Sequence, residues 1–352
     1  MTGQTFGFVY PGAFWQKVDP KTFGWSTKKL DDARQYLRTL APGSVIVVDR
    51  GRIVVEWGDP ARRVKLSSVR KSLLSALYGI YVHQERLDLN KTLEQLGVDD
   101  DPPLTPSEKQ ATLRMLLQSR SGVYHPYVGG APSDRAAMPA RGSHVVGSFW
   151  YYNNWDFNVL GTVFEEQLNT RIAVEFRNRI AIPIQMQDFR LEDMYYFRGT
   201  SKKAAIEDSI HPAYHFRMTA RDMARFGYLY LRQGKWSDVQ IVPNEWVAES
   251  TTSYSEVGNG GGYGYLWWVN GWPGVSVKSY SARGALGKYI IVIPERDLVV
   301  VYQNHTEFPD DAAAMADSDV TKLPSVSGSQ MGKLLALILD AEQFLPTQPG
   351  LR

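Results

Sequence analysis

Apolar residues recur along the chain with two periods, and the change between them separates strand-rich regions from helical ones. Valines and isoleucines predominate in 44–48 and 53–57, on either side of the polar segment 49–52, which is typical of a β-hairpin. Late in the chain, further runs of strand-forming residues follow the Gly-rich loop 258–262 and are separated by turns. These predicted strands cover 265–269, 275–282, 289–293 and 298–303.

Helical spacing flanks the predicted strands at both ends of the chain. Ser26 precedes apolar positions repeated every three or four residues and predicts a capped helix over about 27–40. A similar apolar stripe predicts a closing helix over 326–344. Between the hairpin and the late strands, residues 61–245 have a mostly helical pattern. Inside this insert, Thr105 with Glu108 has capping-box spacing for a helix that includes 113–117, and Thr219 caps another helix.

This order of elements predicts an α+β fold. The early hairpin and the late strands are expected to join in one antiparallel sheet, flanked by the N- and C-terminal helices. We expect residues 1–60 and 246–352 to form this α/β lobe and residues 61–245 to form a mostly helical second lobe. A site between two such lobes is the usual place for small-molecule chemistry, so we expect the active site there.

Composition narrows the classes of partner. The 352 residues are 43% hydrophobic, which suits a globular protein with a sizeable core. The 39 basic and 37 acidic residues nearly balance, which argues against a nucleic-acid partner. Cysteine is absent, which excludes disulfides, thiol catalysis and Cys-based metal sites. A small-molecule substrate is therefore the expected partner, and the sequence gives no indication of oligomeric state.

The first 20 residues lack the basic and apolar regions of a signal peptide. No apolar run approaches the roughly 18 residues that a membrane span needs. We therefore expect no membrane association. We also expect a cytoplasmic location, or export if a leader peptide was cleaved from in front of this sequence.

Candidate chemistry begins with Ser68 and Lys71, three residues apart at the start of the apolar run 73–82. Residues at this spacing share one helical face. Free backbone N–H groups and the helix dipole at an N-terminus favour negative charge, as an oxyanion requires. Roughly one such Ser/Lys pair is expected by chance in a chain of this length. Ser26 with Lys29 is a second match, but Lys29 falls in the first turn of a predicted surface helix.

Two later segments complete a possible site. Tyr152 and Asn154 precede an apolar helix. A tyrosine can relay a proton if nearby cations lower its pKa from about 10. An asparagine can hold a substrate carbonyl. An aromatic loop packed on the core is the alternative interpretation. The Gly-rich segment 281–288 follows a predicted strand and can offer an N–H donor to an oxyanion, or can simply be a turn.

These three elements, in this order, resemble the serine β-lactamase/penicillin-binding-protein superfamily, and most closely its class C-like branch. That branch includes family VIII carboxylesterases, 6-aminohexanoate-dimer hydrolases and D-amino-acid-specific peptidases. The resemblance covers about residues 30–345 and includes 45–57, 116–122, 220–227 and 292–295. The family pattern Y-x-N-x-x-(Y/F)-x-x-L-G selects Tyr152 rather than Tyr151, because it then places Phe157, Leu160 and Gly161 correctly.

The resemblance implies a β-lactamase-like fold and a role for each motif residue. Ser68 is the nucleophile, and Lys71 with Tyr152 is the base. The backbone N–H groups of Ser68 and Ala285 form the oxyanion hole, Asn154 holds the substrate, and no cofactor is required.

The third motif departs from the β-lactamase pattern. β-Lactamases carry Lys-Thr-Gly or His-Thr-Gly there, whereas this chain has Ala282, Arg283 and Gly284. The missing lysine removes a cation that recognises a substrate carboxylate. Arg283 restores a positive charge, but strand alternation can point it to the opposite face from Ala282. Carboxylic esters or small linear amides of the 6-aminohexanoate type are therefore favoured over β-lactams.

Two alternatives remain open. One is a β-lactamase or D-amino-acid peptidase, and the other is a penicillin- or acyl-binding sensor that does not turn over. The candidates for lining the substrate pocket are aromatic: Tyr124, Tyr127, Trp155, Trp267, Trp268 and Trp272, of which Tyr124, Trp155 and Trp268 are preferred together with Gly284 and Arg283. The histidines His125, His305, His211 and His215 are expected to be structural, and no metal site is expected.

Overall fold

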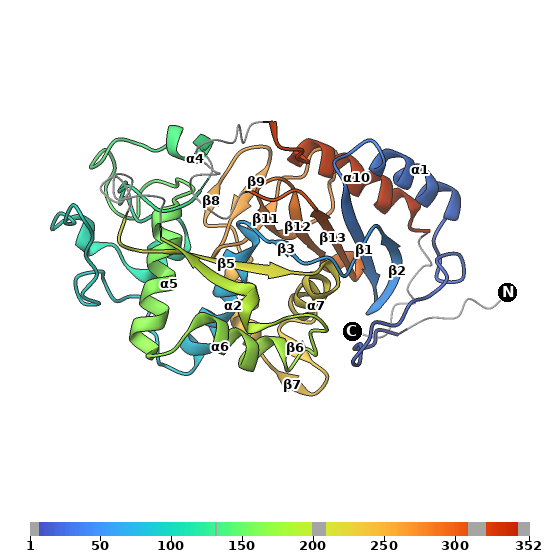
Figure 1. Ribbon diagram of the computed structural model, residues 1–352, viewed down its shortest axis with the longest axis horizontal. Coiled ribbons are helices and arrows are strands. Elements are labelled where there is room, and N and C mark those ends of the chain that lie inside the picture. The colour runs from blue at the N-terminus through green and yellow to red at the C-terminus, as the bar shows by residue number, and fades with distance from the viewer. Residues whose placement is uncertain (1–6, 131, 199–208, 309–321, 344–352) are drawn as a thin grey trace.

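The computed structural model describes residues 7–130, 132–198, 209–308 and 322–343. One eight-stranded sheet runs through it in the order β2-β1-β13-β12-β11-β10-β9-β8, with antiparallel neighbours throughout (Figure 1). The early hairpin joins the last strand, with Val45 opposite Tyr302, so the predicted α+β architecture is confirmed. The strands are β1 Gly43–Asp49, β2 Arg52–Trp57, β8 Ser255–Glu256, β9 Gly261–Tyr263, β10 Trp268–Asn270, β11 Tyr280–Gly284, β12 Lys288–Ile293 and β13 Leu298–Asn304.

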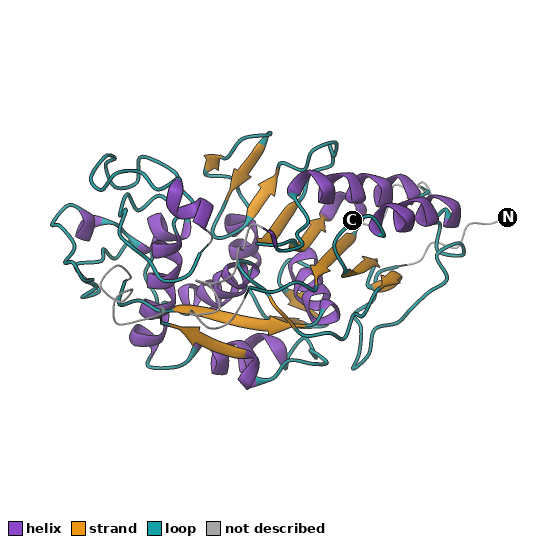
Figure 2. Cartoon of the chain, turned by 45° about the horizontal axis from the view of Figure 1, so that its top comes forward, coloured by secondary structure: helices purple, strands orange, loops and turns teal. Residues whose placement is uncertain are grey.

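The two terminal helices cover one face of this sheet. Helices α1 (Thr27–Leu37) and α10 (Gly328–Ala341) lie side by side there (Figures 1 and 2). Because side chains alternate along a strand, Ile291 and Val300 enter the same core cluster as Leu334 of α10. The predicted serine cap of α1 is confirmed, since the Ser26 hydroxyl accepts from the Lys29 amide. Helix α10 also begins with a serine cap, because the Ser327 hydroxyl accepts from the Gln330 amide.

The opposite face packs on α2 (Val69–His83) and α7 (Ala220–Leu231). Ile290 and Val299 share one core cluster with Phe226 of α7. The Thr219 hydroxyl caps α7 by accepting from the Asp222 amide, as the sequence predicted. The start of α2, where Ser68 lies, is therefore supported directly by the central sheet.

The segment between the hairpin and the late strands supplies most of the remaining helices. They are α3 Leu113–Leu117, α4 Pro132–Ala136, α5 Asn154–Leu168, α6 Ile172–Phe176 and α8 Asn244–Ser250. The same segment contains the 3-10 turns η1 Glu108–Gln110 and η3 Leu191–Asp193 and the π-helical turn η2 Arg177–Ala181. A further 3-10 turn, η5 Pro294–Arg296, joins β12 to β13. The segment also contains strands that the sequence pattern did not indicate. These are β3 Val64–Lys65, β4 Met194–Phe197 and β5 Ala213–Met218 in one sheet of order β3-β5-β4, and a hairpin of β6 Lys235–Trp236 with β7 Val239–Gln240.

Several predicted elements are shorter than expected. The Thr105–Glu108 capping box forms, with the Thr105 amide donating to Glu108 over 2.7 Å, but it caps only the turn η1. Ala111 is extended and breaks the helix, so α3 begins separately behind its own cap, Thr112. The strand predicted over 265–269 begins only at Trp268, because Leu266 has φ +64 and turns the chain.

The strand predicted over 275–282 begins at Tyr280. The Gly-rich loop ends earlier than predicted, since Gly261 already belongs to β9. Among the described residues, no helix is long and apolar enough to cross a membrane.

Gly227 offers a test of the packing between α7 and the sheet. A Cβ there would lie 2.6 Å from Val299 Cγ1 and 2.7 Å from Ile290 Cγ2. We expect Gly227→Ala to lower the free energy of unfolding, measured in urea, by about 1–3 kcal/mol, because a well-packed core resists added volume. The control Gly328→Ala, with no atom within 4 Å of its Cβ, should change it by less than about 0.5 kcal/mol or raise it. Equal effects of the two would contradict this packing.

Candidate active site

Ser68 stands at a sharp turn between β3 and α2. The amide of Leu66 donates to the Phe216 carbonyl of β5 over 2.8 Å, which ties the approach to the small sheet. Ser67 then adopts φ +50, a left-handed conformation that is uncommon for residues other than glycine. Such strain is found preferentially at functional sites. It delivers the partly exposed Ser68 to the N-terminus of α2.

The Lys71 amine lies one helical turn below Ser68. Its Nζ atom is 2.9 Å from Ser68 Oγ, 2.7 Å from Tyr152 OH and 2.7 Å from Asn154 Oδ1. The side chain is 1% exposed, and the rings of Tyr152 and Phe157 lie 4.3 and 4.4 Å from Nζ. The structure thus brings Ser68, Lys71, Tyr152 and Asn154 into one cluster.

Burial has opposite effects on the two titratable groups of the cluster. It lowers the pKa of Lys71 well below its usual value, and the positive charge of Arg70 acts in the same direction, while Asp134 opposes it. Burial raises the pKa of Tyr152. The condition that nearby cations lower the pKa of Tyr152 is therefore not met, because desolvation outweighs the lowering effects of the Ser68 hydrogen bond and the Arg70 charge. The favoured state pairs a neutral amine with a protonated phenol.

The hydrogen-bond geometry suits that state. A neutral amine has two N–H donors and one lone pair. Asn154 Oδ1 and Tyr152 OH can accept the two N–H groups, which leaves the lone pair for the Ser68 hydroxyl proton.

Ser119 fixes Tyr152 from both sides. Its carbonyl accepts from the Tyr151 amide (3.2 Å), and its hydroxyl accepts from the Asn153 amide (3.0 Å) and donates to the Tyr151 carbonyl (2.5 Å). The Tyr151 hydroxyl donates to the Asp134 carbonyl, so Tyr152 and not Tyr151 lies against Lys71. The sequence did not reveal this role of Ser119; the only signal was its place in the family-like segment 116–122.

Asn154 begins α5 and bridges the Lys71 amine and the Asp134 carboxyl group. Its Oδ1 faces Lys71, and its Nδ2 donates to Asp134 Oδ2 of α4 over 3.1 Å. Asn153 caps α5 by accepting from the Trp155 amide. Asp134 was not a sequence candidate, because only the fold brings α4 beside α5.

The proposed oxyanion donors lie close together. A Cβ added to Gly284 of β11 would be 2.4 Å from the Leu66 oxygen and 3.3 Å from the Ser68 nitrogen, so only glycine permits this approach. Ala285 follows directly and is partly exposed. Within the described part of the chain, the amides of Ser68 and Ala285 donate no hydrogen bond.

Ala282 and Arg283 point to opposite faces of β11. Ala282 is buried in the cluster that contains α2. The guanidinium of Arg283 donates to Ser281 Oγ and to the Asn270 carbonyl and lies 3.9 Å from the Trp272 ring. Arg283 is therefore held by the Ser281 and Asn270 oxygens and by the Trp272 ring, with the Trp268 ring at 5.4 Å, on the face of β11 opposite to Ala282.

Of the preferred aromatic candidates, Trp268 is the one beside the cluster. It is partly exposed, and its ring centroid is 5.3 Å from that of Tyr152. Trp155 is fully buried, and its indole donates to Asp100 over 2.6 Å. Tyr124 is 3% exposed, with its hydroxyl 3.1 Å from His144 Nδ1. We therefore do not carry Trp155 and Tyr124 forward as substrate contacts.

The other aromatic candidates, Tyr127, Trp267 and Trp272, are likewise buried. The remaining polar candidates occupy structural positions. His305 pairs with Ser44, His125 with the Pro102 carbonyl and His211 with Thr162. No group of metal-ligating side chains occurs in the residues that the structure describes.

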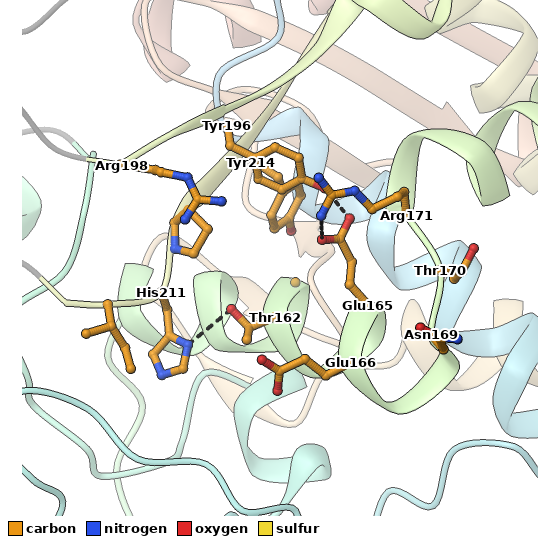
Figure 3. Close-up of a pocket in the computed structure, with 13 residues that line it drawn as sticks. Thr162, Glu165, Glu166, Asn169, Thr170, Arg171, Tyr196, Arg198, His211 and Tyr214 are labelled. Carbon is orange, nitrogen blue, oxygen red and sulfur yellow. Dashed lines mark hydrogen bonds and ion pairs between the residues drawn. The ribbon is translucent and has the colours of Figure 1, made fainter.

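A polar cavity of about 590 Å³ lies between α5 and the sheet β3-β5-β4 (Figure 3). Its wall includes Thr162, His211 and Tyr214, but not Ser68, Lys71 or Tyr152. Glu165 is paired there with Arg171. Volume alone therefore does not locate the chemistry of this protein.

Sequence comparison identifies the family. A model of the family described as "Beta-lactamase" matches residues 32–321. The chain belongs to the β-lactamase family. No curated protein is significantly similar to it in sequence.

Solved structures share the β-lactamase fold. A Bacillus anthracis protein assigned as a 6-aminohexanoate-dimer hydrolase is 20% identical, over 96% of this chain and 87% of that one, with a TM-score of 0.62. A class C β-lactamase is 16% identical over 91% and 96% of the two chains, with a TM-score of 0.61. A D-stereospecific amidohydrolase from Streptomyces sp. is 17% identical over 82% and 98%, with a TM-score of 0.56.

The assignment of Trp155 to the core of this β-lactamase-family protein can be tested. We expect Trp155→Phe to lower the free energy of unfolding by about 1–3 kcal/mol, because Asp100 loses a buried donor. The KM for an ester substrate should stay within twofold. Trp268→Phe is the matched control and should change kcat/KM more than stability. A large KM change in Trp155→Phe with unaltered stability would return Trp155 to the substrate site.

Proposed function

We propose that the protein forms an acyl-enzyme on Ser68 and hydrolyses carboxylic esters or small linear amides. The observation that carries this proposal is the buried Lys71 amine, 2.9 Å from Ser68 Oγ and 2.7 Å from Tyr152 OH. A nucleophile needs an adjacent base with a suitable pKa, and burial supplies it here.

Acylation follows from the positions of these atoms. Neutral Lys71 accepts the Ser68 proton while Oγ attacks the substrate carbonyl carbon. Negative charge develops on the carbonyl oxygen, which the Ser68 and Ala285 amides stabilise; losing one such donor raises the barrier by about 3–4 kcal/mol. Tyr152 donates its proton to the leaving alcohol or amine and recovers one from Lys71.

Deacylation reverses the roles. Lys71 and Tyr152 together accept a proton from water as its oxygen attacks the acyl carbonyl. The bond to Ser68 Oγ then breaks, and the proton returns to Oγ while the carboxylic acid leaves. Asn154 is buried and keeps the amine oriented through its Oδ1, while its Nδ2 donates to Asp134. The second N–H of Nδ2 is the group that holds the substrate carbonyl in this mechanism.

The substrate class rests on Ala282 and Trp268. A buried alanine stands where β-lactamases place a cation for the substrate carboxylate, and Arg283 is engaged elsewhere. The Trp268 ring beside Tyr152 offers apolar surface to an acyl or leaving group. The names of two structural neighbours, a 6-aminohexanoate-dimer hydrolase and a D-stereospecific amidohydrolase, also support an amide or ester substrate.

The test is hydrolysis of a short-chain p-nitrophenyl ester, a linear amide and the chromogenic cephalosporin nitrocefin. We expect ester or amide turnover with little nitrocefin cleavage. Ser68→Ala and Lys71→Met should lower kcat by about 10³-fold or more, since both act in the chemical step. Tyr152→Phe should slow the reaction strongly while leaving the fold intact, as judged by circular dichroism.

Three outcomes separate the alternatives. Most activity retained in Ser68→Ala would overturn the mechanism. Rapid Ser68-dependent nitrocefin hydrolysis would favour a β-lactamase or D-peptidase. A stable mass adduct on Ser68 without turnover would indicate an acyl-binding sensor.

The pKa directions predict the shape of the pH profile. A lowered pKa makes Lys71 neutral at lower pH, so kcat/KM should rise as pH increases through that pKa and then level off. Tyr152, with its raised pKa, stays protonated, so no fall is expected below about pH 10. A profile that falls between about pH 7 and 9 would contradict the proposed proton positions.

A further inference from the structure

Arg70, the residue before Lys71, is a buried cation that the proposed mechanism does not use. Its side chain is 3% exposed, and the guanidinium carbon lies 4.3 Å from the centre of the Tyr214 ring. The Nη2 atom of Arg70 donates a long hydrogen bond to Asn158 Oδ1, over 3.5 Å. Tyr214 also lines the cavity of Figure 3, so Arg70 lies behind that wall.

No carboxylate neutralises Arg70 within the described ranges of the chain. It takes part in no ion pair there, and its buried Nη1 has no hydrogen-bond partner. Arg225 is also deeply buried, but its guanidinium donates hydrogen bonds to the carbonyls of Ile184, Gly12 and Ala13. A buried charge without compensation is unfavourable for stability, so its presence calls for a functional explanation.

Its position supplies one, because Arg70 and Lys71 meet the same face of α5 one helical turn apart. Lys71 Nζ lies 2.7 Å from Asn154 Oδ1, and Arg70 Nη2 lies 3.5 Å from Asn158 Oδ1. Two positive charges repel each other more strongly where water is excluded, and both Arg70 and Lys71 are buried. We propose that Arg70 is a positioning residue that acts through Lys71: its unpaired charge disfavours protonation of the amine and keeps it ready to accept the Ser68 proton.

The other groups around Lys71 do not replace Arg70 in this role. On α4, Asp134 favours the protonated amine. Tyr152, before α5, and Tyr263, on β9, are protonated phenols with raised pKa values. On β5, burial and Arg70 lower the pKa of His215, which is therefore neutral.

More distant charges are also accounted for. Lys65 on β3 and Arg217 on β5 both act on His215, and Arg217 is paired with Glu307. Asp156 on α5 is buried, and burial raises its pKa well above the usual value, which disfavours its charged form. The two charges that act most strongly on Lys71 are therefore Arg70, which lowers the pKa of its amine, and Asp134, which raises it.

The test compares variants that change the charge of Arg70 in two ways. Arg70→Met removes the charge but keeps an unbranched side chain, whereas Arg70→Lys keeps it. Asn158→Asp leaves Arg70 in place and puts a carboxylate beside it, 3.5 Å from Nη2 in the present geometry. The measurement is kcat/KM for a p-nitrophenyl ester from about pH 5 to 10, with folding checked by thermal unfolding.

We expect Arg70→Met and Asn158→Asp to move the acidic limb upward by about one pH unit, which means tenfold lower kcat/KM below the limb. Above the limb, the rates should stay within about threefold of the wild type, and Arg70→Lys should follow the wild-type profile. A carboxylate at position 158 also acts on Lys71 directly and loses the donor to the Val128 carbonyl, so Asn158→Asp supports but does not replace the Arg70 variants. If Arg70→Met does not fold, the neutral and polar Arg70→Gln takes its place and should move the limb in the same way.

An unmoved limb in the folded variants, or an equal loss at every pH, would overturn the inference and leave Arg70 a structural residue. This inference rests on the proposed function. The two fail separately, because Ser68-independent activity would remove the mechanism itself, whereas Ser68-dependent activity with an unmoved limb would remove only the role of Arg70.

Discussion

The exclusion of water from the Lys71 amine is the constraint on which the active site depends. An exposed lysine is protonated at neutral pH and cannot accept a proton. Here Nζ is surrounded by Ser68, Tyr152 and Asn154 and by two aromatic rings, and burial lowers its pKa. In the proposed mechanism, proton transfer therefore depends on a buried amine next to a serine.

The fold makes that position by joining segments distant in the sequence. The β3–β5 pairing and the close approach of Gly284 fix the start of α2. Ser119 holds Tyr152 against the amine from the other side. The central sheet and its helices thus act as a rigid support for a small polar cluster, as is usual when precise geometry is needed at a site.

Local spacing made the core of this site predictable, and long-range packing made the rest unpredictable. Ser68 and Lys71 share a helical face because of their three-residue spacing, and the family pattern separates Tyr152 from Tyr151. The contribution of Ser119 depends on contacts 30 residues or more along the chain, which no local pattern encodes. Trp155 is an aromatic residue of the kind that lines substrate pockets, but only the fold shows that its indole donates to Asp100.

The central claim is that Lys71 is neutral at neutral pH in the free enzyme. Carbon-13 NMR of lysine-labelled protein, with the Lys71 resonance assigned by its loss in Lys71→Met, tests it without any substrate. We expect the Lys71 signal to titrate well below the usual lysine pKa of about 10. A Lys71 signal that titrates at that usual value would contradict the claim.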